Sequence, residues 1–142
     1  MIRILENKDI DRIMEIWLET SIIAHDFISK NYWIDNCEVV KNEYIPICET
    51  YVYEDEGIVK GFIAILKKGF IGAIFIDNKD RGKGIGTKLM NHAKGKYDYL
   101  ALEVYKDNNS SVKFYKKQNF KIIEENFSEE TNKIEYVMEY KK

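Results

Sequence analysis

The chain has 142 residues, of which 45% are hydrophobic and 32% charged, and its formal net charge is −2. This length predicts a single domain, residues 1–142, with a core large enough to fold alone. The near-neutral charge provides no basic field for nucleic acid, and no apolar run approaches the about 18 residues of a membrane span. The first residues also lack the apolar segment of a secretory signal. We therefore expect a cytoplasmic protein that binds neither nucleic acid nor membranes.

The first half of the chain begins with a strand pattern followed by two helix patterns. A short strand is predicted at Ile2–Leu5, and Asn7 can cap the helix that follows. A second helix is expected at about Tyr32–Glu43, and Pro46, the only proline, marks its end. The first helix is identified by apolar residues at steps of three and four: Ile10, Ile13, Met14, Trp17 and Leu18.

Three strand patterns and their turns follow. The runs Ile47–Tyr53, Val59–Leu66 and Ile71–Ile76 are rich in β-branched and aromatic residues. The turns between them, Asp55-Glu56-Gly57 and Lys68-Gly69, are short and contain glycine. Because short turns join neighbouring strands, we predict that these three strands form an antiparallel meander.

The segment Ile74–Leu89 is the most informative part of the chain. An apolar run ends, a charged turn follows, and three alternating glycines open an amphipathic helix. Glycines let a ligand approach the backbone closely, and the unpaired N–H groups at a helix start attract anions. Neither the Walker A spacing nor the Rossmann spacing fits, so another kind of phosphate-binding loop is predicted. Its glycines are Gly82, Gly84 and Gly86, and its cations are Arg81, Lys83 and Lys88.

The second half continues as an alternation of helices and strands. The helix after the glycines ends near Gly95, and the strand Tyr99–Val104 follows it. The intervening segment is long enough for a right-handed crossover between parallel strands. Another helix is expected at Asn109–Gln118, and the chain ends with two strands, Phe120–Glu125 and Ile134–Tyr140. The pattern as a whole predicts an α+β fold with a mixed sheet.

Two motifs together resemble the GNAT superfamily of N-acetyltransferases. Arg81, Gly84 and Gly86 fill the pattern Arg/Gln-x-x-Gly-x-Gly/Ala, which is the coenzyme A pyrophosphate loop of that superfamily. Downstream, a strand, a turn bearing Asn108 and a helix bearing Phe114-Tyr115 are similar to the second half of the GNAT core. The resemblance implies a GNAT-like fold, with a mixed central sheet of about seven strands flanked by helices. Two parallel central strands would splay apart to admit the cofactor.

The resemblance also implies acetyl-CoA as cosubstrate and a set of residues that bind it. The pantetheine arm would pair with the backbone of the strand before the loop, where an N–H near Ile76 would stabilise the reaction's oxyanion. No metal is predicted, because neither His25 nor His92 has a carboxylate or thiol at ligand spacing. The implied cofactor-binding residues are Ile74, Phe75, Ile76, Arg81, Gly82, Lys83, Gly84, Ile85, Gly86, Thr87, Asn108 and Ser111.

Two residues are implied as catalytic. A lysine-type amine has a pKa of about 10.4, so it is protonated at neutral pH and a base must remove its proton. Some GNAT members carry Glu and Tyr at the separation of Glu103 and Tyr115, where they act as general base and general acid. Two alternatives stay open: Glu103 as a surface ion pair with a lysine, and Tyr115 as a packed core residue.

The acceptor side is described less fully by the sequence. The segment around His25, Phe27 and Trp33 resembles one that lines the acceptor cleft in small bacterial GNAT proteins. His25 or Asp26 is an alternative base, and plain packing is an alternative role for the aromatic residues.

These patterns predict an acetyl-CoA-dependent N-acetyltransferase. It would transfer the acetyl group directly to a primary amine of a small molecule, peptide or protein, without an acyl-cysteine, because Cys37 and Cys48 lie outside the predicted cleft. A non-catalytic acyl-CoA sensor or partner-docking module is the alternative. The exposed aromatic residues expected of such a composition are compatible with a monomer or a homodimer.

Overall fold

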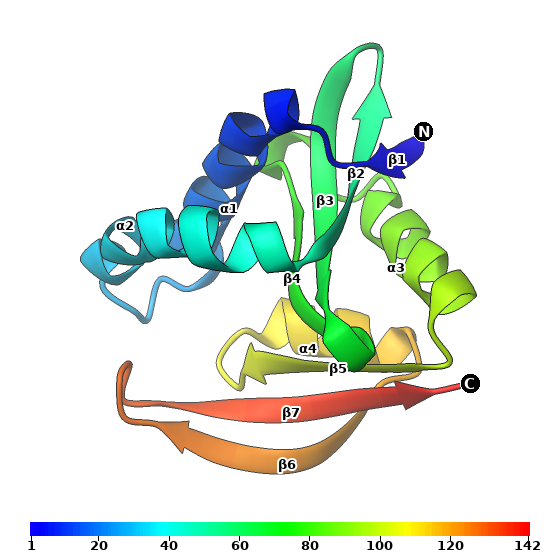
Figure 1. Ribbon diagram of the computed structural model, residues 1–142. Helices are drawn as coiled ribbons and strands as arrows, with labels where there is room; N and C mark the ends of the chain where they lie inside the picture. Colours follow the sequence, from blue (N-terminus) through cyan, green and yellow to red (C-terminus); the bar gives the residue numbers. More distant parts are fainter.

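A seven-stranded mixed sheet organises this computed structural model, which describes residues 1–142 (Figure 1). Its strand order is β1-β2-β3-β4-β5-β7-β6, and only the β4–β5 pair is parallel. The predicted α+β fold and antiparallel meander are therefore confirmed. The strands are β1 (Ile2–Ile4), β2 (Glu49–Asp55), β3 (Ile58–Leu66), β4 (Phe70–Ile76), β5 (Tyr99–Tyr105), β6 (Lys121–Ser128) and β7 (Lys133–Lys141).

Four α-helices flank the sheet, and two of them start differently from the sequence prediction. The helix α2 begins two residues early, because the Ser29 hydroxyl accepts the Asn31 N–H at 3.3 Å and caps it. Before α1, the Asp9 carboxylate, rather than Asn7, accepts the free N–H of Glu6 at 2.9 Å. The helices are α1 (Ile10–Ala24), α2 (Lys30–Val39, continued by a π-helical turn Val40–Tyr44), α3 (Ile85–Lys96) and α4 (Asn109–Lys117).

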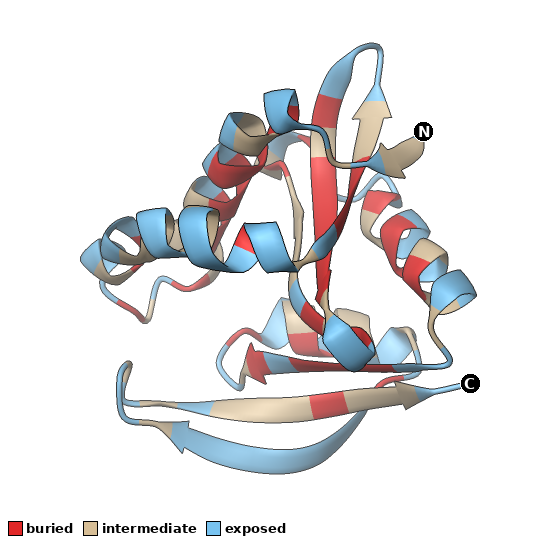
Figure 2. Cartoon of the chain, in the orientation of Figure 1, coloured by how far each residue is buried: buried red, intermediate tan, exposed pale blue.

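Two hydrophobic clusters cover the two faces of the sheet. Alternation along β2 sends Tyr51 to one face and Val52 to the other, and Phe62 and Ile63 of β3 divide in the same way. One cluster packs under α3 and α4, and the other packs under α1 and α2. Buried residues concentrate on β3 and on the sheet-facing sides of α1 and α3, whereas the edge strand β6 is largely exposed (Figure 2). No helix in the structure is both long enough and apolar enough to cross a membrane.

The parallel strands β4 and β5 separate soon after they meet. They pair only at Phe70 with Ala101 and at Ile71 with Leu102. The register with β3 shifts at this point and leaves Gly72 without a partner, which is a β-bulge that bends β4 away. Beyond the bulge, the edge of β4 that would face β5 has no strand partner, and the two strands diverge (Figure 1). The predicted splayed pair is confirmed.

Candidate active site

The divergence of β4 and β5 opens a cleft of about 430 Å³. Thr20 and Ala24 of α1 line it from one face of the sheet, and Phe114 and Tyr115 of α4 line it from the other. The cleft therefore passes between the strands and is reached from both faces. It is lined by both residues implied as catalytic and by every residue implied as cofactor-binding except Lys83, whose ammonium lies 3.2 Å from the Asp80 carboxylate.

The glycine loop forms an open cradle at one end of this cleft. Gly82 and Gly84 have φ of +78° and +82°, which side chains rarely adopt, and a Cβ on either would point into open space. No side chain caps the start of α3, so its first N–H groups face the cradle without a side-chain acceptor. Arg81 lines the same space. Free N–H groups, a helix dipole and a cation fit the pyrophosphate of coenzyme A.

Buried carboxylates anchor the loop. Asp77 accepts the Lys79 N–H at 3.2 Å and pairs with Arg12 of α1, which also donates to the Val59 carbonyl at 3.0 Å. Burial acts to raise the pKa of Asp77, but the hydrogen bonds from Arg12 and the Lys79 N–H, together with the charges of these two residues, outweigh it, so the pKa lies below its ordinary value. Asp80, only 3% exposed, is reached by Lys83 and, at 3.8 Å, by Lys60. The loop is thus tied to both α1 and β3.

Asn108 joins the cofactor side of the cleft to α1. Its side-chain oxygen accepts the Ser111 N–H at 3.3 Å and caps α4, while its amide nitrogen lies 3.1 Å from Nε2 of His25. The other ring nitrogen of His25 donates to the Ser21 carbonyl at 3.0 Å, because a carbonyl can only accept. Burial lowers the pKa of His25, so its ring is neutral and its Nε2 accepts from Asn108. Both ring nitrogens are therefore occupied.

The residues implied as catalytic reach the cleft from opposite faces of the sheet. Tyr115 packs on Phe114 and Phe120, with ring centroids 5.5 and 5.9 Å apart, and still lines the cleft. Burial raises the pKa of its phenol, so the proton is retained at neutral pH. Glu103 is exposed at mid-strand in β5, between buried neighbours. It takes part in no ion pair, so the alternative of a surface pair with a lysine is absent from this structure.

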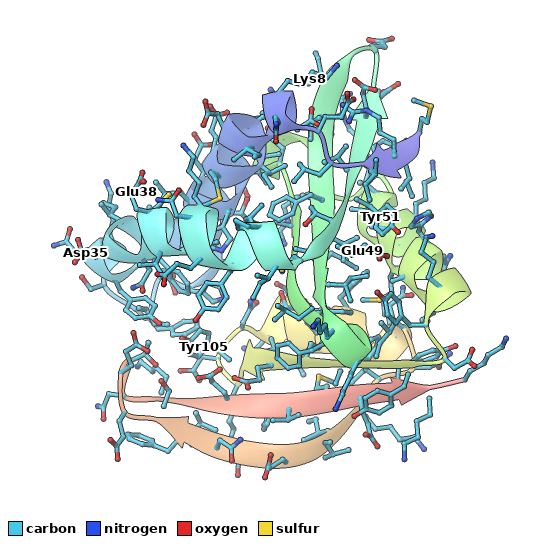
Figure 3. The ribbon with its side chains drawn as sticks, in the orientation of Figure 1. Lys8, Asp35, Glu38, Glu49, Tyr51 and Tyr105 are labelled. Atoms are coloured by element: carbon cyan, nitrogen blue, oxygen red, sulfur yellow. The ribbon has the colours of Figure 1, made fainter.

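The aromatic residues expected at the acceptor cleft lie beside it. His25 and Trp33 are buried and stack at 4.8 Å, while half-buried Phe27 packs edge-on against His25. Tyr105 of β5 contacts all three rings and lies between α2 and the β6–β7 hairpin (Figure 3). None of the three predicted acceptor residues lines the cleft. They form a packed wall behind Asn108.

Two residues of α1 that line the cleft were not predicted from the sequence. Thr20 is buried and its hydroxyl lies 3.4 Å from the carbonyl of Ile76, at the free end of β4. Ala24 lines the cleft one turn further along. Both continue the spacing of the buried residues Ile13 and Trp17, and a threonine within an apolar stripe is a usable signal. What the sequence alone lacked was the location of β4 opposite this stripe.

The fold and the site define a class of protein that binds a coenzyme A thioester between splayed strands. Comparison with known proteins identifies that class. Residues 34–139 match the family model described as an acetyltransferase (GNAT) domain. The chain is 33% identical to the peptidyl-lysine N-acetyltransferase YiaC of Escherichia coli K12, over 99% of this chain and 96% of that protein. It is 32% identical to YjaB of Salmonella typhimurium, also named a peptidyl-lysine N-acetyltransferase, over 85% of this chain and 83% of that protein.

Solved structures agree with this result. Apo YjaB from Escherichia coli superposes with a TM-score of 0.86 at 26% identity, covering 99% of this chain and 96% of that one. An N-acetyltransferase from Thermoplasma acidophilum, solved with coenzyme A, shares the fold with a TM-score of 0.82 at 18% identity, covering 100% and 98%. The chain belongs to the GNAT family. It is an acetyl-CoA-dependent N-acetyltransferase.

Proposed function

We propose that this protein acetylates the side-chain amine of lysine in peptides or proteins. The observation that carries the proposal is the two-sided cleft, in which a carboxylate from one face and a phenol from the other line the same space. An acceptor amine can enter beside Glu103 while the thioester arrives beside Tyr115. The relatives named as peptidyl-lysine N-acetyltransferases support lysine as the acceptor.

The cofactor side of the proposal assigns the binding roles to the chain's own groups. The cradle of Gly82, Gly84 and the start of α3 would hold the pyrophosphate, with Arg81 as its cation. The free edge of β4 would pair with the pantetheine amides. Asn108 keeps one amide hydrogen after its bond to His25, and this hydrogen can serve the same arm. Acetyl-CoA, once bound, supplies an activated thioester.

The catalytic roles follow from the protonation states. Glu103 accepts a proton from the acceptor ammonium, so that the nitrogen can form the new bond to the acetyl carbon as the carbon–sulfur bond breaks. Tyr115 holds its proton at neutral pH and donates it to the departing sulfur. Neither Cys37 nor Cys48 lines the cleft, which supports direct transfer. Both cysteines are free, which supports the reducing cytoplasm as the compartment.

The test measures thiol release from acetyl-CoA with three acceptors. One peptide carries a single lysine and a blocked N-terminus, a second carries a free N-terminus without lysine, and the third acceptor is a small polyamine. We expect turnover on the lysine peptide and a loss of about 10²–10⁴ in kcat for Glu103→Gln and Tyr115→Phe. Acetyl-CoA affinity should stay within a few-fold of the original value in both variants. Turnover confined to the other two acceptors would overturn lysine specificity, and full activity of both variants would overturn the catalytic roles.

A further inference from the structure

A second glutamate lies beside Glu103, on the next strand of the sheet. In the β5–β7 register, Glu103 pairs with Val137 and Tyr105 pairs with Glu135. Residues paired across antiparallel strands share a face, so Glu135 lies diagonally across from Glu103 on the same face. At diagonal positions of this kind, side chains as long as glutamate can reach one another. Glu135 is half-buried and does not itself line the cleft.

This carboxyl pair has no cation. Neither glutamate has a lysine or arginine nitrogen within 4.0 Å, although carboxylates nearby do: Lys141 lies 3.5 Å from Glu139, and Lys106 lies 3.6 Å from Glu125. The groups that surround Glu135 make the absence clearer. Tyr105 is paired with it across the sheet on β5, and Tyr32 of α2 and Glu130 of the β6–β7 turn lie near enough to act on its charge. Lys133 of β7 is on the same face as Glu135, but its ammonium lies over the Phe27 ring, 5.8 Å from the ring centre, and it forms no ion pair with either glutamate.

We propose, on the basis of the proposed function, that Glu103 and Glu135 share one proton and together form the base. Glu135 does not contact the acceptor and acts as a positioning residue, through its effect on Glu103. Glu103 is the member that lines the cleft and meets the acceptor. The missing cation of the pair is then the acceptor ammonium itself. The acceptor class that follows is a protonated primary amine on a slender side chain, which is the chemistry of lysine.

The protons balance through one cycle. A bound ammonium stabilises the doubly ionised pair, since it neutralises part of the repulsion between the carboxylates. When the ammonium gives its proton to Glu103, the neutral amine forms the bond to the acetyl carbon, and the pair returns to its singly protonated form. The acetylated nitrogen loses its second proton to water as the carbon–sulfur bond breaks, Tyr115 protonates the sulfur that leaves, and solvent then returns a proton to Tyr115. The proton that the pair released to solvent when the ammonium bound completes the balance. No oxidant or further reactant is needed.

Glu135 brings to the pair a basicity that an isolated glutamate lacks. Burial and the neighbouring Glu103 raise the pKa of Glu135 to about 7, and this value belongs to the pair as a unit. An isolated glutamate, with a pKa of about 4.3, is a weak acceptor for a proton from an amine. General bases work best when their pKa lies near the working pH. The pair meets this condition at neutral pH.

The first experiment titrates the carboxyl carbons of ¹³C-glutamate-labelled protein by NMR, without any ligand. We expect one titration near pH 7 that involves two side chains, and we expect it to vanish in Glu135→Gln. Glu139→Gln is the matched control, because Glu139 lies on the same face of β7 but opposite Ala101. That control should retain the titration near pH 7. A wild type whose glutamates all titrate below about pH 5.5 would overturn the proposal.

The second experiment measures kcat/KM against pH with the lysine peptide. The acidic limb of the wild-type profile should lie near pH 7. In Glu135→Gln it should move down by more than about one pH unit, and the plateau should fall by about tenfold, because Glu103 alone is the weaker base. Glu135→Asp should restore part of the acidic limb's position and part of the plateau rate, and Glu139→Gln should match the wild type in both.

The two readouts separate failure of this inference from failure of the proposed function. A shared titration by NMR with an unchanged rate profile in Glu135→Gln would mean that the pair exists but is not the base. Turnover confined to amines other than lysine would refute the proposed acceptor, and the pH profile on that amine would still decide the role of Glu135. No turnover on any amine would overturn both.

Discussion

The two sides of the cleft are built by different means. On the cofactor side, most of the residues that we propose for binding lie within one stretch, from Ile74 to Thr87. On the proposed acceptor side, the cleft is lined by residues of α1 and β5, and the second carboxylate that we propose comes from β7, so these groups are far apart in the chain. The first set of residues is therefore local in the sequence, whereas the second is brought together only by folding. A site whose residues are close together in the sequence can be recognised as a motif, and a site assembled from distant segments cannot.

The largest effect on acetyl-CoA binding is expected from a substitution at Gly84, on the cofactor side of the cleft. Alanine there would adopt a left-handed φ of +82° and place a methyl group in the open cradle. We expect acetyl-CoA affinity to fall by tenfold or more, measured by calorimetry. Gly57→Ala is the control, because Gly57 has a φ of +76° and open space in the distant β2–β3 turn. The two variants should lose similar stability, about 1 kcal/mol, and only the first should lose affinity. If the two variants bound acetyl-CoA with equal affinity, the cradle would not be the pyrophosphate site.

The sequence predicted the cofactor side because its information is local. The strand before the glycine loop, the helix after it and the next strand follow from patterns between Ile71 and Tyr115, and the resemblance to the GNAT superfamily implied the splayed pair. Two departures have physical causes. Ser29 caps α2 earlier than the periodicity indicated, and His25, Phe27 and Trp33 pack on one another beside the cleft instead of lining it. Thr20 and Glu135 escaped because their importance depends on which strand lies opposite, and one sequence does not contain that information.

His25 allows a second test, of whether the two sides are coupled. His25→Phe removes the acceptor for the Asn108 amide and leaves that buried group unpaired, at a cost of about 1–3 kcal/mol. We expect the KM for acetyl-CoA to rise several-fold, while kcat and its pH profile stay nearly unchanged. Phe27→Leu, which alters only packing, should leave that KM unaltered. A loss of about 10² or more in kcat would instead make His25 the base and contradict the assignment to Glu103.

The smallest effect is expected at Asp77, which ties the two sides together by joining α1 to the glycine loop through Arg12. Asp77→Asn keeps the shape and an acceptor oxygen but removes the charge, so we expect a loss of about 1 kcal/mol in unfolding free energy at pH 7. The pKa of Asp77 is lowered in the folded state. Its contribution is therefore complete above the ordinary aspartate pKa of 3.8 and disappears as the pH falls through the lower folded value.

Unfolding in urea at pH 7 and at pH 3 would reveal this dependence, with the gap between wild type and Asp77→Asn narrowing at the lower pH. Asp35→Asn is the matched control, since Asp35 is exposed on α2 and forms no ion pair (Figure 3). It should change stability by less than about 0.5 kcal/mol at both pH values. Acetyl-CoA affinity gives the second readout. If Asp77→Asn lowers the binding free energy of acetyl-CoA by more than it lowers the unfolding free energy, the contact with α1 sets the shape of the cradle. The two sides of the cleft would then be coupled, although their residues come from separate parts of the sequence.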